Sequence, residues 1–225
     1  MHWLFFSIVL DFGFVQLFKL GERRGCYAPV VVTANYLTVA TCIGIYLITT
    51  DQWTFSDGAI QTGLITGGLF ISSLLIMNHA LTIAPVGSVL SAFRIAIIVP
   101  VFFGVYLWGE ALNPSQVIGL LLAVLALVMM TPRSKQHPQF TGLRAFGLLT
   151  LICIWQGLSH TSLRSVHYNG LDDAFLQILM ITGGTAGALG VCFITLKKKR
   201  PQIPALRLGI FIGVYNAVAL CVIMI

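Results

Sequence analysis

Two ionisable side chains stand inside long apolar stretches of the sequence. Asp11 lies near the middle of the stretch 3–18, and Arg94 lies within the stretch 86–108. A bare carboxylate at the centre of a membrane-spanning helix costs about 2.5 to 3.5 kcal/mol on insertion scales, so such a group normally faces protein or water. Asp11 is therefore a candidate for binding and releasing a proton, and a structural ion pair or buried hydrogen bond is the alternative.

Arg94 keeps its charge at any realistic pH, so it needs a carboxylate, a phosphate, carbonyl oxygens or water as a partner. It could hold an anionic group of a bound solute, or it could pair with Asp11 so that both charges enter the membrane together. We favour the pair in the resting state, opened when a solute binds.

A polar stripe is predicted on a later helix. Gln156, His160 and Arg164 recur at intervals of four residues, which places them on one helical face, and Asp11, Val15 and Lys19 repeat this spacing. We expect the two faces to be opposite walls of one cavity, although a lone histidine is more often a hydrogen-bonded core residue. Further candidate lining residues, for some of which interhelical hydrogen bonding is an equal explanation, are Asn78, Trp155, Tyr215 and Asn216.

The elements that must position these residues are membrane helices. Hydrophobic residues make up 57% of the chain and charged residues only 9%, and the alternation typical of barrel strands is absent. We predict an all-α multi-pass membrane protein, because a span needs about 20 residues. The eight predicted spans are 3–18, 28–48, 59–79, 86–108, 115–131, 143–163, 173–196 and 206–225.

The cysteine pattern and the net charge do not point to other classes of site. The five cysteines are scattered without a CxxC spacing, so we expect packing roles and neither a metal nor a cofactor. The net charge of +6 reflects membrane topology and not a nucleic-acid partner. Eleven of the thirteen basic residues fall in, or directly next to, the links that follow the first, third, fifth and seventh spans. This predicts that these links face the cytoplasm of an inner or plasma membrane and that the amino terminus lies outside.

An internal repeat appears when the sequence is shifted by about 145 residues. Asp11 then falls on Gln156, and one further residue aligns Gly63 and Gly67 with Gly209 and Gly213. The matching links carry opposite charge, which predicts inverted repeats. We expect a five-helix repeat over 1–131, a cytoplasmic linker over 132–142 and a partial three-helix repeat over 143–225, which lacks two helices. The spacing of Gly63 and Gly67, and of Gly183 and Gly187, favours close helix contacts.

Residues 78–130 carry a series of spaced motifs. An "AL" precedes a helix break, a proline lies within the next helix, "GE" ends it, and "Q-x-x-G" opens the following one. The motif residues are Ala80, Leu81, Pro85, Pro100, Gly109, Glu110, Gln116 and Gly119. In these features the chain resembles the drug/metabolite transporter superfamily, specifically its EamA-type repeat. Glu110 is expected to be a structural feature, hydrated at a helix end, with Asn113 or Ser115 capping the next helix.

The resemblance implies a secondary transporter that moves a small metabolite, amino acid or drug-like solute by alternating access, with proton coupling. Members of this superfamily usually have ten helices, and small multidrug-resistance relatives carry an acid in the first helix, which Asp11 resembles. A partner-dependent, non-transporting subunit is the alternative, since two helices are missing, and a homo- or hetero-oligomer fits either reading. An enzyme acting on lipid-linked substrates is disfavoured, because the sequence shows no HExxH motif, no serine or cysteine nucleophile near a base and no aspartate-rich motif.

Overall fold

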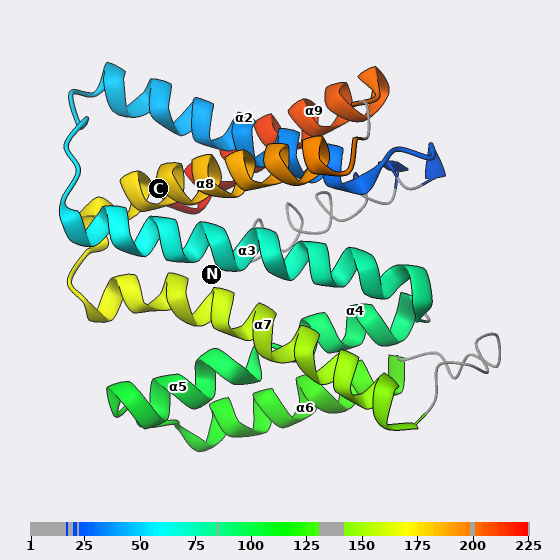
Figure 1. The fold of residues 1–225 in the computed structure, drawn as a ribbon. Coiled ribbons are helices and arrows are strands. Elements are labelled where there is room, and N and C mark those ends of the chain that lie inside the picture. The colour runs from blue at the N-terminus through cyan, green and yellow to red at the C-terminus, as the bar shows by residue number, and fades with distance from the viewer. Residues whose placement is uncertain are drawn as a thin grey trace. The chain divides into compact units, whose positions relative to one another are not determined.

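The computed structural model describes residues 17, 20–21, 23–84, 86–130, 142–198 and 201–224. In these ranges the regular structure is entirely helical (Figure 1). The helices are α2 (Ala28–Thr49), α3 (Asp57–Ile83), α4 (Val86–Ile95), α5 (Ile98–Trp108), α6 (Pro114–Met130), α7 (Gly142–Tyr168), the short 3-10 helix η1 (Asp172–Ala174), α8 (Phe175–Leu196) and α9 (Ile203–Met224).

Five described segments are long and apolar enough to cross a membrane, which supports the predicted helical membrane protein. They are Ala28–Thr49, Asp57–Met77, Gly87–Trp108, Phe146–Tyr168 and Asp172–Leu196. Large apolar side chains are exposed along them, for example Phe102 and Ile65, each 60% exposed. Apart from Leu17, the first predicted span lies outside the described residues and stays a prediction.

The chain forms two compact units, each considered by itself. Unit 1 comprises residues 1–71 and 171–225, and unit 2 comprises residues 72–170. One boundary falls within α3 and the other between α7 and η1. These boundaries follow contacts in space and are distinct from the predicted repeat boundaries.

In unit 1, α2 packs antiparallel to α8 through small residues. A methyl group placed on Gly183 would lie 3.0 Å from the carbonyl oxygen of Tyr36, and one placed on Gly190 would overlap the side chain of Thr33. Gly44 approaches Met180 nearer the other end of the pair. The two backbones therefore run close together, as the spacing of the glycines in α8 predicts.

Helix α9 packs parallel to α2 in unit 1. A methyl group on Gly209 would lie 2.6 Å from the carbonyl oxygen of Val31 and 2.5 Å from Cβ of Ala34. One turn later, a methyl group on Gly213 would lie 2.5 Å from Cβ of Thr38. Only glycine leaves room for this approach at both positions.

The first half of α3 packs parallel to α8 in the same manner. A methyl group on Gly63 would lie 3.2 Å from the carbonyl oxygen of Ile178 and 2.7 Å from Cβ of Ile181. On Gly67 it would lie 2.7 Å from Cβ of Thr185. Each of these two interfaces in unit 1 thus places two glycines, four residues apart, against the backbone of a neighbouring helix.

The two ends of unit 1 carry opposite charges. The amino ends of α2 and α9 meet the carboxyl end of α8, where Val30, Ile194 and Leu208 share one apolar cluster. The exposed basic residues at this end are Arg23, Arg24, Lys197, Lys198 and Arg207. The exposed acidic residues Asp51, Asp57, Asp172 and Asp173 follow or precede the opposite helix ends. This separation agrees with the predicted link charges, while the side that faces the cytoplasm remains a prediction.

Unit 2 contains α4, α5, α6, α7 and the last part of α3. Its apolar core joins Ala80 and Ala84 at the end of α3 to Val89 and Ala92 of α4 and to Ile152 of α7. Helix α7 contacts both α4 and α5, and α6 contacts α4.

Candidate functional site

The predicted span 86–108 is interrupted in the middle. Helix α4 ends at Ile95, Ala96 and Ile97 form a turn, and α5 begins at Ile98. Pro100 lacks an N–H group and cannot donate to the carbonyl of Ala96, four residues earlier. That carbonyl instead accepts a hydrogen bond from the N–H of Val99 at 3.1 Å. The helix break therefore falls at the carbonyl that Pro100 leaves without its helical donor.

Gly157 of α7 packs directly against this break. A methyl group on Gly157 would overlap the side chain of Val99 and would lie 2.9 Å from the carbonyl oxygen of Ala96. Any larger residue would push α7 away from the α4–α5 turn. The absence of a side chain at Gly157 thus lets α7 lie directly against the backbone of the α4–α5 turn.

Polar side chains of α7 next to Gly157 reach α3. Gln156 is 2% exposed, and its Oε1 accepts a hydrogen bond from the Ser73 hydroxyl at 2.5 Å. Trp155 Nε1 donates to the Ser72 hydroxyl at 2.6 Å. The amide nitrogen Nε2 of Gln156 lies 2.9 Å from Nε2 of His160. We call Ser72, Ser73, Trp155, Gln156 and His160 the polar cluster.

With the Gln156 amide in this orientation, its contact with His160 favours one tautomer of the neutral imidazole. An amide NH₂ is a donor only, so Nε2 of His160 must be the acceptor and the neutral imidazole carries its proton on Nδ1. If Nε2 also gained a proton, the two donors would face each other. Gln156 would then have to turn its Oε1 toward His160, and its amide nitrogen would donate to the Ser73 hydroxyl oxygen, so that the hydroxyl hydrogen of Ser73 would need another acceptor.

Arg164, the third residue of the predicted polar stripe, has a different partner. Its Nη2 lies 2.6 Å from both carboxylate oxygens of Glu110. Trp108 and Tyr168, which are close to Glu110 and Arg164 in the sequence, stack their rings with centroids 4.2 Å apart and planes inclined by 4°. The end of α5 is thus joined to the end of α7 by an ion pair and an aromatic stack.

Glu110 corrects one expectation from the sequence. It follows the end of α5, where Gly109 takes the left-handed conformation with φ 65° and the N–H of Glu110 bonds to the carbonyl of Gly104. Its carboxylate, however, is not simply hydrated: it lies against Gly104 and binds Arg164, and its side chain is 20% exposed. Glu110 therefore has a specific partner on another helix.

The "Q-x-x-G" motif has a local explanation. Asn113 precedes α6 and Pro114 is its first residue. Gln116 Oε1 accepts a hydrogen bond from the backbone N–H of Asn113 at 2.9 Å, half of a capping box. A methyl group on Gly119 would meet nothing within 4 Å.

The remaining predicted site residues lie on other helices or outside the described residues. Arg94 lies in the last turn of α4 with an exposed side chain, and Tyr215 and Asn216 are half-buried on α9, in unit 1. Asp11, Pro85 and the side chain of Asn78 lie outside the described residues. Among the described residues, no group of three or more His, Cys, Asp or Glu side chains is placed to hold a metal ion.

Ser72 and Ser73 were missed from the sequence. They lie 83 residues before their partners in α7. Two adjacent serines in an apolar helix are common packing residues, so only the facing helix gives them a role.

Comparison with known proteins gives one relative. The chain is 24% identical over 223 residues to an uncharacterized protein of Haemophilus influenzae, and the alignment covers 96% of this chain and 76% of the relative. No protein-family model matches the sequence. No solved structure matches it either.

Proposed function

We propose that this protein is a secondary transporter of the drug/metabolite transporter class that moves a small polar solute by alternating access. The observation that carries the proposal is the polar cluster of α3 and α7, which lies beside Gly157 and the broken helix α4–α5 within an apolar helical unit. Broken helices beside buried polar groups are typical of solute sites in secondary transporters.

The chemistry of the polar cluster favours a solute that is recognised by hydrogen bonds. When His160 is neutral, the five side chains of the polar cluster carry no formal charge but offer hydroxyl, amide, imidazole and indole groups. The indole of Trp155 adds an apolar ring surface. We therefore expect a small polar or amphipathic metabolite, with its polar groups replacing the serine hydroxyls as partners of Gln156 and Trp155.

The inverted repeat is also part of the proposal, and the glycine contacts of unit 1 support it. Shifting Gly63 and Gly67 by 146 residues gives Gly209 and Gly213. The residues that these glycines contact are related by a shift of 147 residues: Ala34 corresponds to Ile181, and Thr38 corresponds to Thr185. The two interfaces therefore bring corresponding residues together. The pair of α9 with α2 thus corresponds to the pair of α3 with α8. Because α2 and α8 are antiparallel, the rotation that exchanges the two pairs is about a two-fold axis that crosses the helices between α2 and α8.

Proton coupling would act through His160 and Asp11. Protonation of His160 at Nε2 requires the amide of Gln156 to turn, so that the Ser73 hydroxyl changes from donor to acceptor of Gln156 and its hydrogen becomes available to a solute. This gives the polar cluster two arrangements that differ by one proton. Asp11 remains the second candidate for the coupling group.

Transport measurements on Gln156→Leu test the proposed function. Leucine keeps the volume but removes the contacts that the Gln156 amide makes with Ser73 and His160, so uptake or efflux should fall at least about tenfold, equivalent to about 1.4 kcal/mol. Ser159→Ala is the matched control, because the Ser159 hydroxyl donates to the carbonyl of Trp155 in its own helix. Metabolite profiling of cells with and without the gene supplies the solute, and equal profiles in both would contradict the proposal.

The pH dependence of transport separates the two coupling candidates. If His160 couples, His160→Gln should keep transport but flatten its dependence on an imposed pH gradient. If Asp11 couples, Asp11→Asn should abolish the pH-driven component while the protein remains inserted. Unchanged pH dependence in both variants would remove proton coupling by these residues.

Labelling of introduced cysteines tests the inverted topology. Single cysteines at Thr54 and at Lys198, on a background in which the native cysteines are replaced, should react with an impermeant reagent from opposite sides of the membrane. Labelling of both from the same side would contradict the inverted repeat. The native Cys26, Cys42, Cys153 and Cys192 are free thiols, so the background substitutions remove no disulfide among them.

A further inference from the structure

We propose that the basic end of unit 1 is a binding site for the headgroup of an anionic phospholipid. We call this site the basic end; it consists of Arg23, Arg24, Lys197, Lys198 and Arg207, all exposed. They come from three segments that are distant in sequence: the turn before α2, the end of α8 and the first turns of α9. The site is separate from the polar cluster and does not depend on transport.

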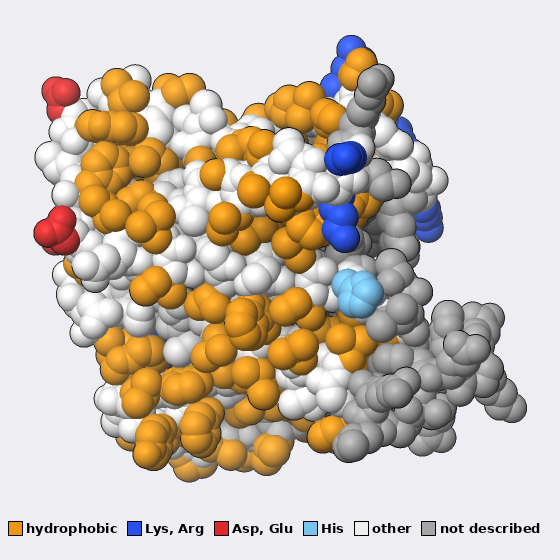
Figure 2. All heavy atoms as spheres, in the orientation of Figure 1, with side chains coloured by type: hydrophobic (Ala, Val, Ile, Leu, Met, Phe, Trp, Pro, Cys, Tyr) orange, Lys and Arg blue, Asp and Glu red, His pale blue; other side chains and the backbone are white. Residues whose placement is uncertain are grey.

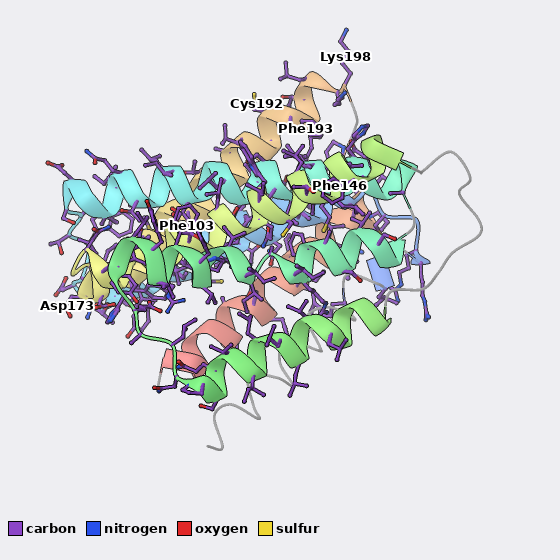
Figure 3. All side chains as sticks on the ribbon, turned by 90° about the horizontal axis from the view of Figure 1, so that it is seen from below. Phe103, Phe146, Asp173, Cys192, Phe193 and Lys198 are labelled. Atoms are coloured by element: carbon purple, nitrogen blue, oxygen red, sulfur yellow. The ribbon has the colours of Figure 1, made fainter. Side chains whose placement is uncertain are left out.

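The packing of α2, α8 and α9 brings these charges to one end. Val30 and Val31 of α2, Ile194 of α8 and Ala205 and Leu208 of α9 form one buried cluster directly below them. All the described carboxylates of unit 1 lie beyond the opposite helix ends. Figure 3 shows Lys198 and Asp173 at opposite ends of α8. Among the described residues of this end, no carboxylate neutralises the basic charges, so they can attract an anionic headgroup.

The surface next to the basic end is apolar. Leu196 is 77% exposed and Ile203 is 66% exposed, and Phe211 and Ile210 continue the exposed apolar face along α9. Figure 2 shows apolar side chains adjoining the Lys and Arg side chains on the visible face. A ligand that fits both parts needs an anionic group and hydrocarbon chains, which a phospholipid has and a free phosphate lacks.

The position of the charges also matches the depth of a headgroup. Helix α8 spans 22 residues and ends at Leu196, so Lys197 and Lys198 follow the last apolar residue of a candidate span. Lys197 Nζ lies 5.8 Å from the centroid of the Phe193 ring, one turn inside the helix. Basic residues next to a span attract anionic headgroups electrostatically.

Native mass spectrometry of the purified protein tests the site. The protein is exchanged into micelles containing equal amounts of phosphatidylglycerol and phosphatidylcholine, and the bound lipid is counted. We expect about tenfold more bound phosphatidylglycerol, and about equal binding in the variant Lys197→Gln/Lys198→Gln/Arg207→Gln. The charge-conserving variant Lys197→Arg/Lys198→Arg/Arg207→Lys should keep the preference, and so should Asp172→Asn/Asp173→Asn.

Three outcomes would overturn the proposal. Equal binding of the two lipids by the unsubstituted protein needs no variant and removes the site. A preference that survives neutralisation places the lipid elsewhere. Displacement of phosphatidylglycerol by an equal concentration of inorganic phosphate would identify a site for a soluble anion. The measurement uses protein that is already folded and inserted, so an effect of these charges on topology alone would leave lipid binding unchanged.

Discussion

Gly157→Val should prevent α7 from packing on α4–α5 and should greatly reduce the yield of folded protein. The new Cβ would overlap the Val99 side chain and would press on the carbonyl oxygen of Ala96, which belongs to backbone and cannot move alone. Overpacking of this kind costs about 1 to 3 kcal/mol or more. The adjacent Gln156 would be displaced with the helix, so we also expect loss of transport.

Gly147→Val is the matched control for this prediction. Gly147 lies on the same helix, and a methyl group there would meet nothing within 4 Å. Both substitutions change the intrinsic helix propensity equally, so their difference reports the contact with the break. Size-exclusion chromatography in detergent and the melting temperature from tryptophan fluorescence measure it. Equal yields and melting temperatures for the two variants would show that the close approach of α7 is not required.

Removal of the Glu110–Arg164 pair should give the second largest effect. Glu110→Gln or Arg164→Gln alone should each destabilise the protein by about 1 to 2 kcal/mol, because a charged partner is left in a half-buried place with 20% or 39% of its side chain exposed. The double variant should lose little more than the worse single variant, since both charges are then gone.

A double-mutant cycle of unfolding free energies in detergent measures the coupling. A coupling energy near zero would mean that the two side chains do not depend on each other. Gly104→Ala provides an independent perturbation, because its methyl group would lie 2.8 Å from Oε2 of Glu110 and would displace the carboxylate without removing a charge. If the pair stabilises the protein, this variant should also be less stable and should reduce the measured coupling.

Local signals in the sequence correctly located most of the described helices. The predicted ranges 28–48 and 173–196 agree with α2 and α8 within two residues at each end. Apolar length determines a span in lipid, because every backbone polar group must be paired within the helix. Asn113 and Pro114 likewise mark the start of α6 by local chemistry that needs no distant partner. The proline within the predicted span 86–108 is visible in the sequence, but the two-residue break at Ala96 and Ile97 is seen only in the structure.

The partners of polar side chains could not be derived in this way. Gln156, His160 and Arg164 share one helical face by their spacing, yet Gln156 binds Ser73 of α3 and Arg164 binds Glu110 beyond α5. Helical periodicity defines the direction of a side chain and not which helix it meets. Glu110 was assigned to water for the same reason: its neighbour is 54 residues away in sequence.

The sequence by itself determined a helical membrane protein, most of its spans, the separation of basic from acidic links and the residues with unusual chemistry in apolar surroundings. These properties depend on composition, length and local capping. Only the tertiary structure decided that Gly157 lies against the α4–α5 break, that Ser72 and Ser73 complete the polar cluster, and that Glu110 has an arginine partner. The physical reason is that close packing selects partners by the shapes of both surfaces, and one surface alone does not specify the other.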